Sequence, residues 1–261
     1  MQNITLHITD NIATVSLNRP EVRNAMDEAT IAQLHKAFKQ VAADAGIRAM
    51  VLRGEGKAFC AGGDLNWMRR GADYGEAENT ADAQKLGEML YALHTLNKPT
   101  IAMVHGAAFG GGVGLVAACD VALGLENSKF CLSEVKIGLI PSVISPYVIA
   151  AMGQRQARRF YQTAEVLDAE KAQSVGLLHE VFSTENAQQQ ALDDLLAQIK
   201  QNSPKAMGVA KAQIFKIAHK KLGEDLVAET ARDIAAQRAT DEGKEGVTAF
   251  LEKRKPDWVT K

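Results

Sequence analysis

Apolar and polar side chains first alternate along the chain with a period of two. Residues 4–8 (ITLHI) and 12–17 (IATVSL) show this alternation, which is typical of strands with one face in a core. Residues 9–11 (TDN) lie between them and are of types that favour a tight turn. The pattern predicts a hairpin at the start of the chain.

Helical spacing and short apolar runs then follow each other. Residues 27–45 and 79–97 carry apolar side chains three or four positions apart, which predicts two helices, the first capped by Asp27. Their apolar positions are Ile31, Leu34, Phe38 and Val41 in the first helix and Leu86, Leu90, Leu93 and Leu96 in the second. Residues 48–54 and 99–106 are apolar runs of strand length. This alternation of strands and helices predicts an α/β core.

The pattern changes after residue 185, where only helical segments follow. These segments are residues 186–201, 203–221, 223–238 and 245–255. Ser203 and Pro204 form a good helix start, and an apolar face runs along the second segment. Short helices bury little by themselves, so this region must pack on the core or on another subunit. We therefore expect a core at 1–185 and a helical oligomerisation region at 186–261.

Composition narrows the class of protein. The 261 residues are 46% hydrophobic and 23% charged with a net charge of -1, so neither nucleic acid nor an anionic membrane is expected as a partner. Cys60, Cys119 and Cys131 are an odd number without CxxC spacing, which argues against a disulfide framework or a metal site and for a reducing compartment. With no leader segment and no long apolar run, we expect a cytoplasmic protein.

Two glycine-bearing loops are the candidate chemical features. Gly110 to Gly112 come just before a predicted helix, and Gly62 and Gly63 precede a second one capped by Asp64. Free N–H groups at such helix starts can bind an anion or a developing oxyanion. The glycines can equally be turn residues that supply positive φ. The pattern alone leaves both interpretations open.

A nucleotide site is a competing interpretation of the same glycines. Residues 112–117 (GVGLVA) loosely match the dinucleotide-binding pattern that follows a strand. Glu134 then stands roughly where that pattern has its ribose-binding acid. Residues 107–109 separate that strand from the glycines, which weakens the match. Walker A, GxSxG and HExxH motifs are all absent, which excludes P-loop hydrolases, elbow-type serine hydrolases and zincins.

Several spaced motifs together resemble the crotonase superfamily of enoyl-CoA hydratases and isomerases. These are KAFCAGGDL (57–65), KPTIAMVHGAAFGGGVGLVAACD (98–120), FCLSEVKIGLIPS (130–142), SLNRPEVRNAMD (16–27) and FLEKRKPDW (250–258). The resemblance covers essentially the whole chain. It implies a spiral of ββα turns, C-terminal helices that build a trimer or a dimer of trimers, and no cofactor beyond the CoA of the substrate.

The resemblance also assigns the site residues. A thioester oxygen would accept hydrogen bonds from the N–H groups of Gly63 and Gly111, which strengthen as enolate charge develops. The substrate-binding residues implied are Glu21, Val22, Arg23, Ala25, Cys60, Ala61, Gly62, Asp64, Leu65, Asn66, Gly110 and Gly114. Arg23 is either near a CoA phosphate or a solvated surface residue, and Lys253 and Lys255 are candidates to reach a neighbouring subunit's CoA.

One of the two family glutamates is missing. The first falls at Gly114, whereas the second matches Glu134, which is therefore the expected catalytic acid and base. Ser142 and Ser145 either help to place water or cap a helix. The chain looks most like bacterial hydratases of leucine and acyclic-terpene breakdown, which act on 3-methylglutaconyl-CoA or its isoprenoid analogue. The distal carboxylate of such a substrate needs a cation, for which Arg69 and Arg70 are the candidates.

Two other functions remain as alternatives. A 3,2-enoyl-CoA isomerase needs only one shuttling glutamate, and certain other hydratases, including those acting on feruloyl-CoA, also manage with one. A crotonase-fold RNA-binding or scaffold protein without activity is a more remote alternative. The absence of a basic stripe and the presence of Glu134 and both glycine loops argue against it.

Overall fold

Nine strands form two sheets in the computed structural model, which describes residues 2–260. The larger sheet has the order β1-β2-β3-β4-β6-β9, and its strands are parallel except for the β1–β2 pair; the smaller has the order β5-β7-β8. The strands are β1 (Ile4–Thr9), β2 (Ile12–Leu17), β3 (Ala49–Gly54), β4 (Thr100–Val104), β5 (Ala107–Phe109), β6 (Val121–Leu125), β7 (Lys129–Cys131), β8 (Leu167–Asp168) and β9 (Glu180–Phe182).

Helices cover both faces of the larger sheet and continue beyond it. They are α1 (Glu28–Ala43), α2 (Leu65–Gly71), α3 (Glu76–His94), α4 (Gly111–Ala118), α5 (Ser145–Thr163, bent at Gly153), α6 (Ala169–Ser174), α7 (Glu185–Gln201), α8 (Pro204–Ile217), α9 (Glu224–Ala239), α10 (Asp241–Leu251) and α11 (Asp257–Thr260). Two single 3-10 turns, η1 (Pro20–Val22) and η2 (Glu134–Ile137), complete the elements.

The predicted hairpin and first helix are confirmed. Asp10 and Asn11 both have positive φ between the paired residues Thr9 and Ile12, which is the geometry of a tight two-residue hairpin turn. The carboxylate of Asp27 accepts a hydrogen bond from the Thr30 N–H and so caps α1. Turn and cap residues therefore predict the two hairpin strands and the start of the first α-helix correctly.

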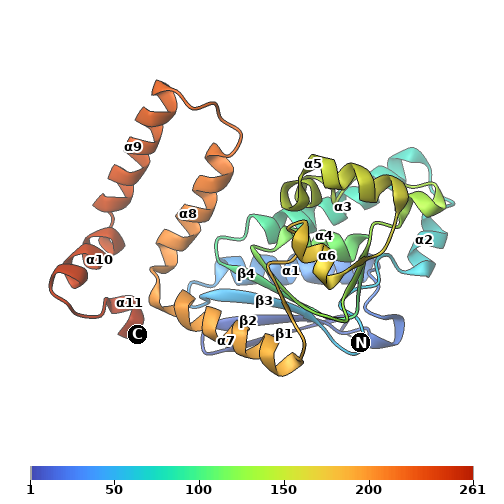
Figure 1. The fold of residues 1–261 in the computed structure, drawn as a ribbon, viewed down its shortest axis with the longest axis horizontal. Helices are drawn as coiled ribbons and strands as arrows, with labels where there is room; N and C mark the ends of the chain where they lie inside the picture. Colours follow the sequence, from blue (N-terminus) through green and yellow to red (C-terminus); the bar gives the residue numbers. More distant parts are fainter. Residues whose placement is uncertain (1, 261) are drawn as a thin grey trace.

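The larger sheet carries two cores because alternate residues of each strand face opposite sides. Met50 and Leu52 of β3 lie in the main core with side chains of α1, α3, α4 and α5. Val51, between them, packs on the other side with Leu192 and Ile199 of α7. Figure 1 shows α7 across the face of the sheet opposite α1 and α3. Helix α7 thus packs on the core, so the helices that leave the core begin with α8.

Helices α8, α9 and α10, which we call the C-terminal arm (residues 204–251), extend away from the sheets (Figure 1). Several contacts hold α8 to the core: Met207 packs against the second core, Gly208 lies against the backbone of Asn97, and Lys211 Nζ contacts Asp120 Oδ2 at 2.8 Å. The Phe215 ring also lies 4.4 Å from that of His94. Within the described residues, none of the helices has the length and apolar character needed to cross a membrane.

Candidate active site

A short parallel pairing joins the two glycine loops. The Cys60 N–H donates to the Ala107 carbonyl at 3.0 Å, and the Phe109 N–H donates to the Cys60 carbonyl at 2.9 Å. Cys60 is fully buried, which raises the pKa of its thiol to about 12. Both backbone polar groups of Cys60 are thus engaged and its thiol is buried, so Cys60 holds the two loops together; its predicted contact with substrate stays a prediction.

The N–H of Gly63 is free. Met26 pairs with this loop by donating to the Gly62 carbonyl at 2.7 Å and accepting from the Asp64 N–H at 2.8 Å. In such a parallel bridge the middle residue turns its own polar groups away from its partner. The Gly63 N–H accordingly donates to no acceptor among residues 2–260.

The N–H of Gly111 is free for a different reason. It opens helix α4, where the first N–H groups have no acceptor inside the helix, and it meets none elsewhere in the described part of the chain. Gly110 before it has φ 49° and ψ -116°, a conformation that favours glycine. A Cβ at position 111 would lie 2.6 Å from Met26 Cε, so Met26 contacts Gly111 with its side chain and the Gly62 loop with its backbone. The structure thus brings Gly63 and Gly111 to one place.

Glu134 lies directly beside α4. It begins the turn η2, and its Oε1 would be 3.3 Å from a Cβ at Gly110. Its Oε2 is buried and has no hydrogen-bond partner among the described residues. Burial raises the pKa of this carboxyl above its ordinary value of 4.5. A half-buried acid whose Oε2 has no partner among the described residues is a candidate for proton exchange.

Position 114 is closed by an apolar side chain. A Cβ at Gly114 would lie 2.3 Å from Ile144 Cγ2 and 3.0 Å from Ile144 Cβ, distances that real side chains do not tolerate. The space that a larger residue at 114 would need is therefore filled by Ile144. On this face of α4 the missing family acid has an apolar replacement.

The segment before α1 lines the other side of the Gly62 loop. The Ala61 N–H donates to the Arg23 carbonyl at 2.9 Å, so residues 21–26 run alongside the loop. Glu21, Val22 and Arg23 are exposed, whereas Ala25 is buried. Of these four predicted CoA-binding residues, three are thus exposed beside the loop and Ala25 lies beneath them.

Sequence reasoning did not single out three residues that hold this segment. Arg19 donates to the Ala25 carbonyl at 2.6 Å and pairs with Asp64 at 2.9 Å and Asp27 at 3.3 Å. Asn24 is buried and donates to the carbonyls of Glu55 and Ala58 at 2.8 and 2.7 Å. Arg19, Asn24 and Met26 all lie in the motif SLNRPEVRNAMD, which was the available signal.

Helix α2 begins at the predicted cap, Asp64. Its carboxylate accepts from the Asn66 N–H at 2.8 Å, and although burial acts to raise the pKa of Asp64, this bond and Arg19 outweigh it and lower the pKa. Leu65 is 76% exposed at the start of α2. Arg70 pairs with Glu28 at 2.6 Å, whereas Arg69 donates to the neutral side chain of Asn66.

Other polar candidates have structural partners. The Ser145 hydroxyl donates to the Pro141 carbonyl at 2.5 Å and accepts from the Tyr161 hydroxyl at 3.1 Å. Ser142 is exposed. The Asp120 carboxylate accepts hydrogen bonds from the Thr100 N–H at 2.9 Å and from Lys211 at 2.8 Å. None of the described residues forms a cluster of three or more metal-ligating side chains.

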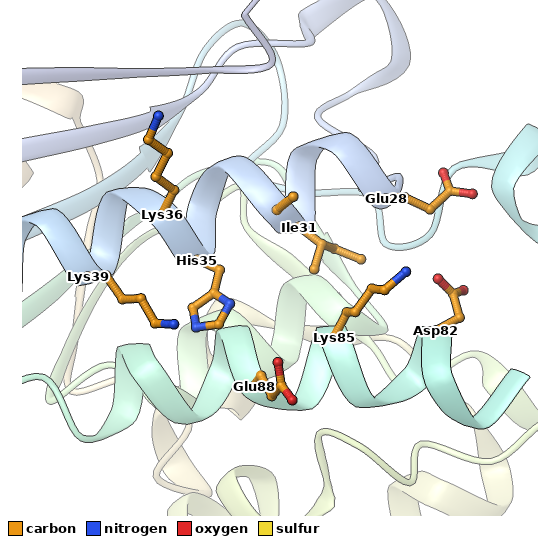
Figure 2. Close-up of a pocket in the computed structure, with 9 residues that line it drawn as sticks. Glu28, Ile31, His35, Lys36, Lys39, Asp82, Lys85 and Glu88 are labelled. Carbon is orange, nitrogen blue, oxygen red and sulfur yellow. The ribbon is translucent and has the colours of Figure 1, made fainter. Parts of the chain in front are cut away.

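A surface groove between α1 and α3 lies apart from these groups. Figure 2 shows its lining, in which Lys36, Lys39 and Lys85 are interspersed with Glu28, Asp82 and Glu88. Charges of both signs alternate along it, and Glu28 and Asp82 are already bonded by Arg70 and by the Trp67 ring N–H. The groove therefore lacks the buried acid and free N–H groups found around Glu134.

Known proteins match this chain over nearly its whole length. The family model for enoyl-CoA hydratase/isomerase matches residues 7–261. The 2,3-dehydroadipyl-CoA hydratase of Escherichia coli (strain K12) is 32% identical over 260 residues, 99% of this chain and 99% of the relative. The solved structure of an enoyl-CoA hydratase from Shewanella pealeana ATCC 700345 is similar, with 38% identity, a TM-score of 0.95 and coverage of 98% of this chain and 96% of that chain. The structure of Pseudomonas aeruginosa AtuE is also similar, with 34% identity, a TM-score of 0.94 and coverage of 98% of this chain and 99% of that chain. The chain has the crotonase fold and belongs to the enoyl-CoA hydratase/isomerase family of enzymes.

Proposed function

We propose that this enzyme adds water across the 2,3 double bond of an enoyl-CoA thioester and uses Glu134 as its one acid and base. The observation that carries the proposal is the buried, unpartnered Oε2 of Glu134 beside the start of α4. A carboxyl in this environment can accept a proton from water and return it near neutral pH. No cofactor beyond the CoA of the substrate takes part.

The free N–H groups of Gly63 and Gly111 bind the thioester oxygen. As water oxygen bonds to C3, the π electrons of the double bond move through C2 to the thioester oxygen, which becomes an enolate. Hydrogen bonds to that oxygen strengthen as its charge grows, so they stabilise the transition state more than the substrate. Such donors are typically worth about 100- to 1,000-fold in rate each.

Glu134 completes the proton balance. Its carboxylate takes one proton from the attacking water while the C3–O bond forms. The resulting carboxylic acid then gives that proton to C2 as the enolate returns its electrons, which restores the ionised Glu134. One carboxyl thus serves both steps, in agreement with the absence of an acid at Gly114.

The CoA lies along the exposed segment formed by Glu21, Val22 and Arg23, beside the Gly62 loop. The hydrogen bond between Ala61 and Arg23 and the bridge between Met26 and Gly63 support this location, because they fix the segment next to the free N–H groups. The Arg23 guanidinium is near a phosphate of the bound CoA. Lys253 and Lys255 of a neighbouring subunit are further candidates for the same contact.

The substrate class we propose is the CoA ester of a branched dicarboxylic acid such as 3-methylglutaconic acid. The similar 2,3-dehydroadipyl-CoA hydratase has a name that also denotes a dicarboxylic acyl group. Arg69 is the better candidate for the distal carboxylate, since its partner is the neutral Asn66 while Arg70 is held by Glu28.

A 3,2-enoyl-CoA isomerase is the second candidate function. The observation that favours it is the same single carboxyl, since a double-bond shift moves one proton between C2 and C4 and requires no water to be held. The two functions share the oxyanion site and Glu134. They differ in whether water enters the site.

A spectrophotometric assay separates these functions. The purified enzyme is given 3-methylglutaconyl-CoA and, separately, a 3-enoyl-CoA, and the absorbance of the conjugated thioester is followed. We expect loss of absorbance with the first substrate, and Glu134→Gln to lower the rate about 100- to 10,000-fold. Glu126→Gln, at an exposed position in the turn after β6, is the matched control and keeps the wild-type rate.

Each other result has a defined meaning. A gain of conjugation with the 3-enoyl-CoA only makes the enzyme an isomerase. A wild-type rate for Glu134→Gln overturns Glu134 as acid and base, whichever substrate reacts. Turnover of unbranched enoyl-CoA but not of 3-methylglutaconyl-CoA overturns the proposed substrate class.

We also propose that the chain assembles as a homotrimer or a dimer of trimers through its helical region. Large apolar side chains of the arm are exposed, among them Ile214 (62%) and Phe250 (81%). Exposed apolar surface of this extent usually marks a protein contact. Light scattering should give three or six times the chain mass, and Ile214→Asp with Phe250→Asp should lower it; a single-chain mass for the wild type contradicts the proposal.

A further inference from the structure

Glu134 and Ile144 both lie against the first turn of helix α4. Gly110 is the N-cap of this helix, with the non-helical φ 49° and ψ -116°, and Gly114 lies inside the helix four residues later. The carboxyl of Glu134 lies against the first position and the side chain of Ile144 against the second. The position beside Glu134 and the position beside Ile144 are therefore about one helical turn apart along the chain.

Ile144 is held firmly at this position. It is 3% exposed, and its carbonyl accepts hydrogen bonds from the N–H groups of Tyr147 and Val148, both at 3.1 Å, as α5 begins. Ser145, the next residue, is tied to Pro141 and Tyr161. Leu90 of α3 lies 3.6 Å from where a Cβ at Gly114 would be. Since these neighbours come from different elements, Ile144 cannot move aside cheaply.

We infer that Ile144 is a specificity-determining residue that keeps this active site at one carboxylate by filling the volume of a side chain at position 114. The inference rests on the proposed role of Glu134 and extends it to a second position. A side chain introduced at 114 would meet Ile144 Cγ2, and the three atoms nearest to its Cβ would all be apolar carbons of Ile144 and Leu90. Position 114 and position 144 are thus coupled, and changing the chemistry of the site requires changing both.

Four variants test this coupling: Gly114→Glu, Ile144→Ala, the double variant G114E/I144A, and the double variant G114E/I144V. Alanine at 144 removes Cγ2, which makes the closest contact, whereas valine keeps a branched Cβ and serves as the matched control. Thermal unfolding is measured for each variant, together with hydration of the unbranched crotonyl-CoA. The unfolding measurement reports the coupling even if the protein hydrates nothing.

We expect Gly114→Glu to lower the unfolding temperature and to lose at least tenfold in activity. G114E/I144A should be more stable than the sum of its single changes predicts, and G114E/I144V should not be. With two carboxylates available, G114E/I144A should hydrate crotonyl-CoA at least tenfold faster than Ile144→Ala does, within the 100- to 10,000-fold range of a general acid or base. Its pH–rate profile should show a second ionisation that the wild type lacks.

The opposite results overturn the inference. If Gly114→Glu unfolds at the wild-type temperature, Ile144 does not close position 114. If the changes in G114E/I144A are additive, or if valine rescues as well as alanine does, the two positions are not coupled through Cγ2. If the two positions are not coupled but Glu134→Gln is inactive, only the inference about Ile144 fails and the proposed function stands. If the positions are coupled but Glu134→Gln is active, only the proposed function fails.

Discussion

The core and the C-terminal arm differ in how much of their apolar side chains they bury. In the core, large side chains such as Phe38, Phe59 and Phe130 are fully buried between sheets and helices. In the arm, Ala249 is the one apolar residue among those described that is buried, while Ile214, Phe215, Phe250 and other large side chains stay exposed. The core therefore buries its large apolar side chains within one chain, whereas the arm leaves its own exposed.

This difference explains where the chemistry lies. The N–H groups of Gly63 and Gly111 and the carboxyl of Glu134 need fixed positions. The packed core fixes the segments that carry them through contacts of Met26, Cys60 and Ile144. The arm contributes no residue to that site within the chain. Within the chain the arm is held by contacts of α8 and, near its other end, by Trp258, whose ring lies against Gly246 and whose ring N–H donates to the Gln201 carbonyl at 3.0 Å.

The largest expected effect contrasts two phenylalanines. Phe130→Ala should destabilise the protein by about 3–5 kcal/mol, because it removes a fully buried ring from the main core. Phe250→Ala, at an 81% exposed position, should cost less than about 0.5 kcal/mol in a single chain. Chemical denaturation at two protein concentrations gives the free energy of unfolding of both variants. If the stability lost in Phe250→Ala depends on protein concentration, Phe250 contacts another chain. Equal losses at both positions would contradict the contrast.

A smaller effect is expected where the arm meets the core. Lys211→Met should cost about 2 kcal/mol, because it leaves the carboxylate of Asp120 without its charged partner in a partly buried place. Lys216→Met is the matched control, since Lys216 pairs with Asp233 at the solvent-exposed side of α8 and α9 and its loss should be much smaller. Thermal unfolding of the two variants compares them, and a larger loss for Lys216→Met would show that the arm is held elsewhere.

Helix caps in the two regions should differ less. Asp27→Ala and Ser203→Ala each remove a side chain that caps a helix, which costs about 1 kcal/mol. Asp27 also pairs with Arg19 near the Gly62 loop, so its loss should lower activity as well as stability. Ser203, whose hydroxyl also bonds Glu242, should change stability alone. Denaturation and steady-state kinetics on the same samples test this, and an activity loss for Ser203→Ala would oppose it.

The smallest expected effect is a pH-dependent gain in stability from Glu134→Gln. Burial raises the pKa of Glu134 in the folded state above its ordinary value of 4.5, so ionisation is harder in the folded than in the unfolded chain. Wild-type stability contributed by this group is present below pH 4.5 and is lost as the pH rises through the folded pKa. The variant does not titrate, so its advantage should appear only above pH 4.5. An advantage that is constant with pH would show that the carboxyl is not desolvated.

Much of the fold was predictable because its signals are local. Asp10 and Asn11 allow the hairpin turn, Asp27, Asp64 and Ser203 cap the helices they precede, and the spacing of Leu90 and Leu93 fixes the buried side of α3. Several boundaries moved: α3 begins earlier, at Glu76, α4 begins at Gly111 itself, and α10 begins at Asp241 instead of residue 245. Strand β5 is among the elements that were not predicted, since three residues without periodicity carry no signal until β7 pairs with them.

From the residues alone one can read the alternation of strands and helices, the family motifs, the presence of Glu134 and the absence of an acid at Gly114. Long-range packing, by contrast, places the Met26 side chain against Gly111, buries Cys60 and brings Ile144 into the space beside Gly114. The physical reason is that hydrogen-bond caps and periodicity act between residues a few positions apart. Contacts such as that of Gly114 with Ile144 exist only after packing has brought distant segments together, so no local pattern encodes them.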